Sequence, residues 1–190
     1  ITLRGEDVTL AKNTLFRGVQ KFLFRRAGYL CSNNQALLDD VSFPGLETGM
    51  QMIPNGVAME KYANGDGPSV RQMLDISADE KVVLFIGWMI YRKGVDYLLK
   101  GWAKMKTEGC RLVLVGEGPE QDEFEKLAAE LGVKGNVTFA GKVNPDVVPD
   151  YLNACDIFIL PSLAEGMPNV VMEAMASGRA VVATRVQGTP

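Results

Sequence analysis

The chain has 190 residues, a length that fits one α/β domain with additional material, or one domain and a part of another. Hydrophobic residues make up 47% and charged residues 23%, which is typical of a globular protein and excludes disorder over most of the chain. The net charge of −3 predicts no broad basic surface, so we expect no nucleic-acid partner, and no apolar run approaches the roughly 20 residues of a membrane span.

Histidine is absent, and the three cysteines have no spacing typical of a metal site or a disulfide framework. The sequence therefore excludes a His-based catalytic triad and a His-ligated zinc site in this chain. Cys31, Cys110 and Cys155 lie in apolar surroundings. We interpret them as small core residues of a protein in a reducing compartment, the cytoplasm.

The first part of the chain, residues 1–57, alternates short strand-like runs with helical patterns. We predict strands at 1–3, 28–31 and 50–53, and helices at 13–26 and 35–40. The longer helix is amphipathic and carries Arg17, Lys21, Arg25 and Arg26, which we interpret as its solvated face in preference to a membrane-binding face. This part is too small for a complete core, so we interpret it as the remnant of an N-terminal α/β domain.

Residues 58–79 contain a strong turn signal, Asn64-Gly65-Asp66-Gly67-Pro68. We predict that this stretch is a linker between the remnant and a second domain at 80–190.

The second domain has a regular alternation of strands and helices. We predict strands at 82–86, 112–115, 137–140, 157–160 and 180–183, and helices at 95–105, 124–131, 148–154 and 168–176. Most of the strand runs are continuously apolar, as expected for strands that are covered on both faces. The fold class that follows is α/β, with a doubly wound, Rossmann-like parallel sheet built from right-handed βαβ units.

The helix predicted at 168–176 contains a residue that breaks its pattern, Glu173. The helix is apolar nearly all round and should be buried, yet glutamate is almost never buried without a partner. Eight residues earlier stands Glu165, in a turn where Gly166 and Pro168 open the helix and backbone N–H groups are unpaired. The pair predicts a polar pocket whose carboxylates accept hydrogen bonds from sugar and ribose hydroxyls. The alternative is that Glu165 caps the helix and Glu173 pairs with an arginine.

A second departure is Arg92-Lys93-Gly94, at the start of the helix that follows the first strand of the domain. Cations at a helix amino-terminus oppose the helix dipole, at a cost of roughly 0.3–1 kcal/mol each. A bound phosphate would reverse that sign, because the helix end and the cations then attract the same anion. We therefore predict a phosphate site here. The alternative is that both side chains extend into water.

Two further features after strands are less specific. Gly116-Glu117-Gly118-Pro119 lacks the third glycine of a dinucleotide fingerprint, so we interpret it as a tight strand-to-helix turn. Trp88 and Tyr91 either stack on a base or are partly buried aromatics of a turn.

Taken together, these residues resemble the group 1 family of retaining glycosyltransferases, which has the two-domain GT-B architecture. The resemblance is strongest over residues 82–190. It is carried by the runs 84–87, 92–96, 114–119, 137–141 and 154–162, and by Glu165 and Glu173 with seven residues between them, the E-x7-E signature of the family. Ile53-Pro54-Asn55-Gly56-Val57 resembles the passage from the acceptor domain to the donor domain, and Arg4 stands where many members carry histidine.

The resemblance implies roles for individual residues. Lys93 and Glu165 would be the catalytic residues, and Arg92 would join Lys93 in binding the diphosphate. The other donor-binding residues would be Gly87, Val143, Gly166, Met167, Asn169, Val170 and Glu173, of which Glu173 would bind the ribose. Arg4 and Gly5 would lie on the acceptor side. Trp88 replaces an arginine of many members, which would leave phosphate neutralisation to Lys93 and Arg92.

The implied reaction transfers a hexosyl group from a UDP-, GDP- or ADP-linked sugar to a glycan, lipid or small-molecule acceptor. By the resemblance it retains the anomeric configuration and needs no metal and no other cofactor. We expect a cytoplasmic protein, with peripheral association of the full-length enzyme with the inner face of the membrane as an alternative.

The resemblance also implies that the chain is the C-terminal donor domain of a GT-B fold with the tail of the acceptor domain, cut short at both ends. We hypothesise that such a piece binds nucleotide or nucleotide sugar and turns nothing over. Two alternatives stay open, a non-catalytic nucleotide-sugar-binding module and a GT-B-like sugar-nucleotide epimerase.

Overall fold

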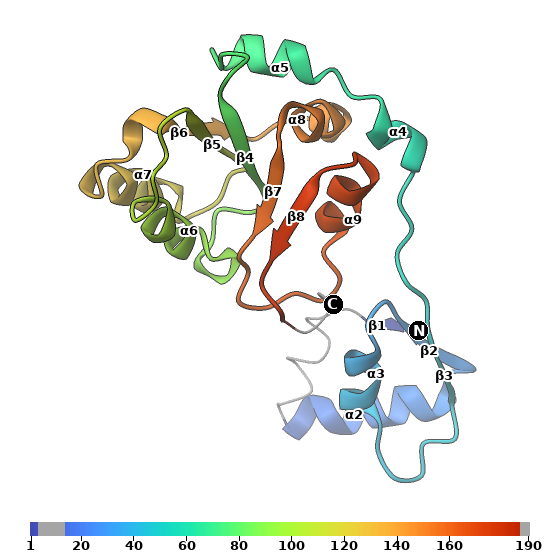
Figure 1. Ribbon diagram of the computed structural model, residues 1–190. Coiled ribbons are helices and arrows are strands. Elements are labelled where there is room, and N and C mark those ends of the chain that lie inside the picture. The colour runs from blue at the N-terminus through green and yellow to red at the C-terminus, as the bar shows by residue number, and fades with distance from the viewer. Residues whose placement is uncertain (4–13, 187–190) are drawn as a thin grey trace. The chain divides into compact units, whose positions relative to one another are not determined.

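The computed structural model describes residues 1–3 and 14–186 (Figure 1). The chain divides into two compact units, which are described separately. The first contains the described residues of Ile1–Gly56 together with Glu165–Pro168, and the second contains Val57–Ala164 and Asn169–Val186.

The second unit is built on a parallel sheet, which in the described part of the chain has five strands in the order β6-β5-β4-β7-β8 (Figure 1). The strands are β4 (Lys81–Ile86), β5 (Cys110–Val115), β6 (Val137–Gly141), β7 (Ile157–Leu160) and β8 (Ala180–Ala183). Strands β4 and β5 pair over their whole length, from Lys81 opposite Cys110 to Ile86 opposite Val115. The register places the ends of these two strands, and therefore the loops that follow them, side by side.

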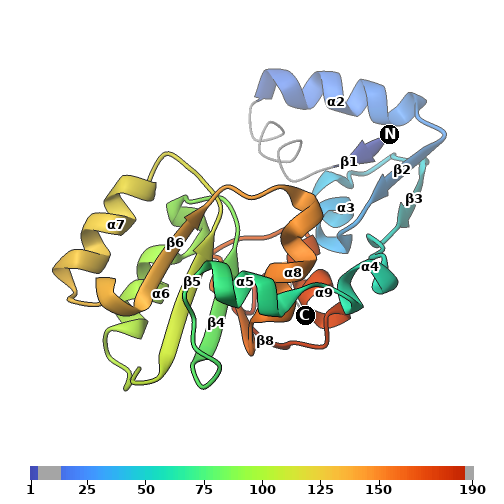
Figure 2. The ribbon, with the colours of Figure 1, turned by 90° about the horizontal axis from the view of Figure 1, so that it is seen from above.

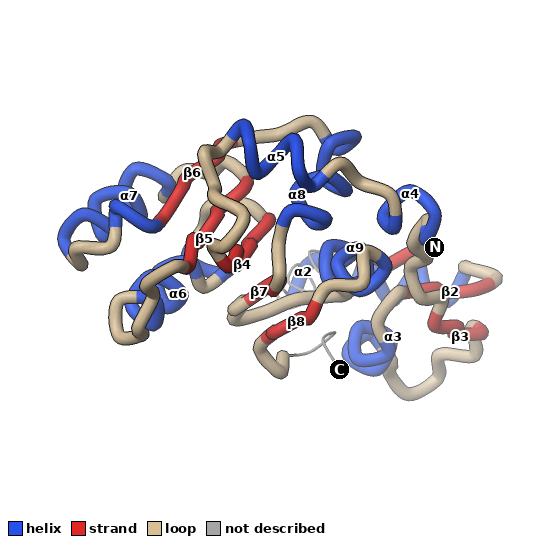
Figure 3. The backbone as a smooth tube through the Cα atoms, turned by 45° about the horizontal axis from the view of Figure 1, so that its top comes forward, coloured by secondary structure: helices blue, strands red, loops and turns tan. Residues whose placement is uncertain are grey.

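Helices connect consecutive strands and cover both faces of this sheet (Figure 3). They are α6 (Val95–Trp102), α7 (Gln121–Glu130), α8 (Val148–Ala154) and α9 (Asn169–Ala176). The chain runs from β4 outward to β5 and β6, then returns to β7 on the other side of β4 and continues to β8. Because parallel crossovers are right-handed, this reversal puts α6 and α7 on one face and α8 and α9 on the other.

The core of the second unit lies between the sheet and these helices. It includes the fully buried Phe85, Leu99, Phe124 and Phe158. The apolar residues of α6 recur every three or four positions, so that one stripe of that helix faces β4 and β5 while Tyr97 and Lys100 stay exposed.

Residues 58–79, predicted as a linker, form two short helices and group with the second unit. These are α4 (Met59–Ala63) and α5 (Gly67–Met73). Val70 and Ile76 join the core, and the Arg71 guanidinium donates to the carbonyl of Ala154, which ends α8, over 2.9 Å. The turn signal in the sequence is real, but it separates two helices that pack on α8 and does not mark a free connection.

The first unit is smaller. Its described residues form a parallel sheet in the order β1-β2-β3, made of β1 (Thr2–Leu3), β2 (Tyr29–Ser32) and β3 (Gly49–Met52). Helix α2 (Thr14–Arg26) lies alongside these strands, and α3 (Gln35–Val41) connects β2 to β3 (Figure 2). The buried cluster consists of Leu3, Phe24, Leu30, Leu38 and Val41.

The predicted fold class is confirmed. Each predicted strand and helix is present, with ends that differ from the prediction by a few residues. The predicted helix at 95–105 is shorter, because α6 ends at Trp102 and Met105 is exposed. The helices α4 and α5 were missed, because glycines and a proline within seven residues resemble a loop more than the capped starts of short helices.

Candidate functional site

The carboxyl ends of β4 and β7 form the topological switch point of the second unit. The two strands are neighbours, with Leu84 opposite Phe158, yet the chain leaves them toward opposite edges of the sheet. The connections then diverge to the two faces of the sheet. Open α/β sheets bind ligands at such a point. Of the two departures from the local sequence pattern, Arg92-Lys93-Gly94 lies in the loop after β4, and Glu173 lies in α9, the helix that follows β7.

The loop after β4 contains a short 3-10 helix, η1 (Tyr91–Lys93), which ends at Gly94. Gly94 has a φ of +72°, and a Cβ at this position would lie 2.1 Å from the carbonyl oxygen of Pro161, in the loop after β7. Only glycine permits both the left-handed backbone and this close approach. The glycine of the Arg92-Lys93-Gly94 run is therefore explained by contact between the two loops.

Arg92 forms hydrogen bonds between the same two loops. Its backbone carbonyl accepts a hydrogen bond from the N–H of Leu163 over 2.8 Å, and its Nη1 donates to the carbonyl of Ala164 over 3.3 Å. The predicted phosphate ligand is thus in contact with the segment that leads to Glu165. Lys93 lies next in η1 and is half-buried, one residue before α6 begins at its Gly94 cap.

A second close approach joins the turns after β4 and β5. Gly116 has a φ of +135°, and a Cβ there would lie 1.9 Å from the carbonyl oxygen of Gly87. The N–H of Met89 donates to the carbonyl of Glu117 over 2.8 Å. The turn that we interpreted as an ordinary strand-to-helix turn therefore supports the loop that carries Arg92 and Lys93.

A pocket with a cavity volume of about 210 Å³ lies at the carboxyl ends of β4, β5 and β6. Two of the residues predicted to bind the donor line it, Gly87 and Val143. The other lining residues are Ile86, Trp88, Val115, Gly116, Glu117, Lys142, Pro145 and Val148. The wall is mostly apolar, with one ion pair at its edge, between Lys142 and Glu117 at 2.6 Å. Trp88 is 48% exposed, so its ring is available to a planar ligand.

Glu173 lies in α9 and is half-buried, and Tyr62 of α4, a helix that packs on α9, lies near it. Burial, followed by the negative charge and hydrogen bond of Glu173, raises the pKa of Tyr62 to about 12. The nearby Arg179 donates to the carbonyls of Ser177 and Cys155. The alternative considered from the sequence was that Glu173 pairs with an arginine, and the ionisable neighbour that the structure gives it is Tyr62, in the stretch predicted as a linker.

The remaining predicted residues of this region fall into two groups. Asn169 and Val170 open α9 in the second unit, where Val170 packs against the core. Glu165, Gly166 and Met167 group with the first unit. In that unit the Asn34 amide donates to the carbonyl of Gly166 over 2.8 Å, and the N–H of Asn55 lies 3.4 Å from the sulfur of Met167.

Arg4 and Gly5, predicted on the acceptor side, lie outside the described residues. Among the residues that are described, no group of three or more His, Cys, Asp or Glu side chains is arranged to hold a metal ion. Within the same ranges, no helix is long and apolar enough to span a membrane.

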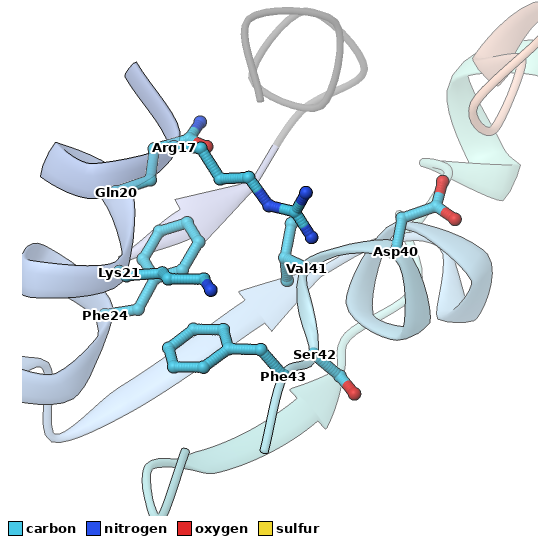
Figure 4. Close-up of a pocket in the computed structure, with 8 residues that line it drawn as sticks. All are labelled: Arg17, Gln20, Lys21, Phe24, Asp40, Val41, Ser42 and Phe43. Atoms are coloured by element: carbon cyan, nitrogen blue, oxygen red, sulfur yellow. The ribbon is translucent and has the colours of Figure 1, made fainter. Parts of the chain in front are cut away.

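The first unit has a small pocket between α2 and the residues that follow α3 (Figure 4). Arg17 and Lys21 of α2 extend into it, and Lys21 lies 5.1 Å from the centre of the Phe43 ring. On α2 the apolar Phe16, Val19, Phe22 and Leu23 are each about half exposed, between 48% and 54%. The buried Phe24 alone of these neighbours faces the small core, so the helix presents an apolar surface away from its own sheet.

Comparison with known proteins identifies the fold and the family. The sequence pattern of the family Glycosyl transferases group 1 matches residues 80–190. The lipopolysaccharide core biosynthesis glycosyltransferase LpsE of Rhizobium meliloti is 34% identical over 165 residues, which cover 87% of this chain and 46% of LpsE. The putative teichuronic acid biosynthesis glycosyltransferase TuaC of Bacillus subtilis is 27% identical, over 99% of this chain and 47% of TuaC.

Among solved structures, HepE of Anabaena in complex with UDP and glucose superposes with a TM-score of 0.82 at 25% identity, over 98% of this chain and 52% of HepE. Sucrose-phosphate synthase of Thermosynechococcus elongatus superposes with a TM-score of 0.79 at 25% identity, over 98% of this chain and 50% of that protein. The chain therefore spans about half the length of these relatives. The matched family pattern covers more than half of the chain, its parallel sheets match those of GT-B glycosyltransferases, and the chain belongs to the group 1 glycosyltransferases.

Proposed function

We propose that this chain is the donor-binding portion of a retaining glycosyltransferase, which transfers a hexosyl group from a nucleoside-diphosphate sugar to an acceptor. The observation that carries the proposal is the tie between the loops after β4 and β7, made by Arg92, Leu163 and Ala164. The tie fixes Arg92, and with it the loop that carries Lys93, at the switch point of the sheet, where a helix start and positive charge attract a diphosphate.

The pocket beside the switch point suits the nucleoside. Its apolar wall and the exposed Trp88 ring fit a flat base, and it opens next to Gly87, at the root of the loop that carries Lys93. The structure of HepE, which shares the fold, contains bound UDP and glucose. We therefore propose that the base occupies this pocket, that Lys93 and Arg92 bind the diphosphate, and that Glu173 accepts hydrogen bonds from the ribose.

In the proposed reaction, fixed positive charges stabilise the leaving group. When the bond between the anomeric carbon and the diphosphate breaks, negative charge grows on the departing nucleoside diphosphate, and fixed cations stabilise it in a site of low dielectric. Glu165 with the backbone of Gly166 and Met167 would hold the sugar hydroxyls. The new bond forms between the anomeric carbon and a hydroxyl oxygen of the acceptor, and the proton of that hydroxyl passes to the departing diphosphate. Neither a metal nor another cofactor takes part in this scheme.

Calorimetric titration of the chain with UDP, GDP and ADP, each alone and as its glucose conjugate, tests the proposal. We expect saturable heat with at least one of these nucleotides. The absence of heat with all of them would contradict a donor site and favour a non-catalytic module.

We also propose that helix α2 makes a peripheral contact with the inner face of the membrane. It has four cations and no acidic residue, and its half-exposed Phe16, Val19, Phe22 and Leu23 form an apolar surface beside them. Apolar residues inserted at an interface and cations that attract anionic headgroups are the two parts of a peripheral membrane contact.

Vesicle flotation tests this contact. The protein should float with vesicles that contain 30% phosphatidylglycerol and stay behind with pure phosphatidylcholine, and Phe22→Ser should weaken flotation while Tyr97→Ser, an exposed aromatic of the second unit, should not. Equal flotation with both vesicles, or none with either, would refute the membrane contact. Self-association that Phe22→Ser abolishes would assign the surface to a second copy.

A further inference from the structure

Asn34 is a buried polar residue of the first unit whose side chain joins two distant segments of the chain. It is 8% exposed and is the N-cap of α3. Its Oδ1 accepts a hydrogen bond from the N–H of Ala36 over 2.9 Å, and its Nδ2 donates to the carbonyl of Gly166 over 2.8 Å. One amide group therefore starts a helix and also holds a peptide that lies 132 residues further along the chain.

The two contacts together require an asparagine. The Ala36 N–H needs an acceptor and the Gly166 carbonyl needs a donor, which fixes the orientation of the amide between them. Aspartate or serine would cap α3 equally well. An aspartate carboxylate has no hydrogen to donate, however, and a serine hydroxyl is a single atom that cannot occupy both positions. Capping alone thus does not explain why the residue is asparagine.

The base on which Asn34 stands is tied to the small sheet of the first unit. The N–H of Asn34 donates to the hydroxyl of Ser32 over 3.2 Å, and that hydroxyl donates to the carbonyl of Leu3 over 3.3 Å. Ser32 ends β2 and Leu3 ends β1, and both side chains are buried. The amide that reaches Gly166 is therefore held at the end of two paired strands.

The peptide that Asn34 holds is one proposed to bind the donor sugar, so the inference rests on the proposed function. Apart from its chain neighbours, no described heavy atom lies within 4 Å of where a Cβ on Gly166 would be, so packing does not hold this glycine. The peptide bond that follows it is trans, so the Gly166 carbonyl and the Met167 N–H point in opposite directions. Holding the carbonyl therefore fixes the direction of the N–H that would donate to a sugar hydroxyl.

We propose that Asn34 is a positioning residue, which holds the peptide between Gly166 and Met167 in the orientation that binds the hydroxyls of the donor sugar. The geometry that carries this is the amide of a helix cap, anchored through Ser32, that donates to the carbonyl of a glycine with no packing of its own. Affinity for the sugar part of the donor thereby depends on a side chain that need not touch the sugar.

The test compares Asn34→Ser with the unchanged protein, by calorimetry with the tightest binder among UDP, GDP and ADP and with its glucose conjugate. Serine keeps the cap of α3, adds no charge and removes the donor to Gly166. We expect affinity for the glucose conjugate to fall about 3- to 10-fold, as for one lost hydrogen bond, and affinity for the nucleotide alone to stay unchanged.

Asn64→Ser is the matched control, because the Asn64 amide also donates to a backbone carbonyl, that of Glu60, over 3.1 Å. This variant should change neither affinity. Asn34→Asp is the second variant. It keeps the cap and the shape of the side chain but places a carboxylate oxygen against the Gly166 carbonyl, so it should lower affinity for the glucose conjugate, relative to the nucleotide, at least as much as Asn34→Ser does.

An equal loss for the two ligands in Asn34→Ser, or no loss for the glucose conjugate, would overturn the positioning role. If the unchanged protein binds none of the three nucleotides, alone or as conjugates, the proposed function itself fails. That outcome is distinct from an Asn34→Ser variant that binds both ligands as the unchanged protein does.

Discussion

The two units of this protein differ in how they hold their polar residues. At the carboxyl ends of β4, β5 and β7 in the second unit, loops are joined by hydrogen bonds and by glycines that leave no space for a side chain, at Gly94 and Gly116. In the first unit, α2 packs on a buried cluster of five described residues and exposes apolar residues and three of its four cations, while Lys21 is half-buried beside Phe43. In the second unit, Arg92 lies in a loop that hydrogen bonds join to a neighbouring loop. In the first unit, Arg17, Arg25 and Arg26 are exposed on the surface of a helix.

The contrast teaches which property each region needs. Binding a diphosphate at a defined place requires cations whose loops do not move, because a small displacement weakens every contact at once. A surface that attracts a membrane needs charge and exposed apolar area, and it tolerates side-chain freedom. In the second unit, substitutions that move the backbone of the loops should therefore have the largest effect on ligand binding. In the first unit, the effect should depend on the charge and the apolar area that a substitution removes from α2.

The largest effect is expected for Gly116→Ala. The added Cβ would meet the carbonyl of Gly87 at 1.9 Å on a backbone with φ of +135°, so the turn must move. We expect the free energy of unfolding to fall by about 2–4 kcal/mol and nucleotide affinity to fall with it, as measured by denaturant titration and calorimetry. Gly132→Ala is the control, since Gly132 shares a positive φ of +73° but has nothing within 4 Å of a Cβ. Similar losses for the two variants would mean that the Gly87 contact is unimportant.

Lys93→Ala should come next. Loss of one charge-assisted contact to the diphosphate should weaken nucleotide binding by about 1.5–3 kcal/mol, roughly 10- to 150-fold, with little change in stability. Lys21→Ala removes a cation of the first unit and should leave nucleotide affinity unchanged while it weakens binding to anionic vesicles. If Lys93→Ala and Lys21→Ala change nucleotide affinity equally, or change vesicle binding equally, the proposed difference between the two units is wrong.

A smaller effect concerns Asp156, which precedes β7 at the opposite end of the sheet from the proposed site. Its carboxylate accepts from the N–H of Val82 over 2.8 Å and from Lys81 over 3.1 Å, with Arg71 at 3.9 Å. Burial opposes ionisation, but the Val82 and Lys81 hydrogen bonds and the two positive charges outweigh it, and the pKa of Asp156 is lowered.

Because the folded-state pKa of Asp156 is lowered, its contribution to stability is present at neutral pH and is lost as pH falls through that pKa. Asp156→Asn should therefore cost about 1 kcal/mol at pH 7, a value kept low for the solvent exposure of the side chain, and little at pH 2. Chemical denaturation at both pH values measures this, and a cost that does not depend on pH would contradict the role of the charge. Nucleotide affinity at pH 7 should be unaffected, since the residue lies away from the proposed site.

Much of the fold was predictable because its signals are local. The continuous apolar runs of β4 and β5 and the spaced apolar residues of α6 identify a parallel sheet covered by helices, and the observed bounds agree closely. The exception, α4 and α5, shows the limit of such signals. Gly65 is present because the chain runs against Pro149 of α8, a contact that no local pattern contains.

The individual residues of the candidate site stood out in the sequence, but the contacts that support them did not. Arg92, Lys93 and Glu173 stood out because each breaks the preference of its own segment. The nearness of Tyr62 to Glu173 did not, because Tyr62 precedes Glu173 by more than a hundred residues and tyrosine in a short helix is ordinary in a sequence.

A crystal structure of the protein with bound UDP tests the central claim most directly. We predict that the diphosphate lies at η1 within hydrogen-bond distance of Lys93, that the base lies in the pocket lined by Trp88 and Val143, and that the ribose faces Glu173. Nucleotide density at another surface, with the pocket lined by Trp88 and Val143 empty, would contradict the proposed donor site.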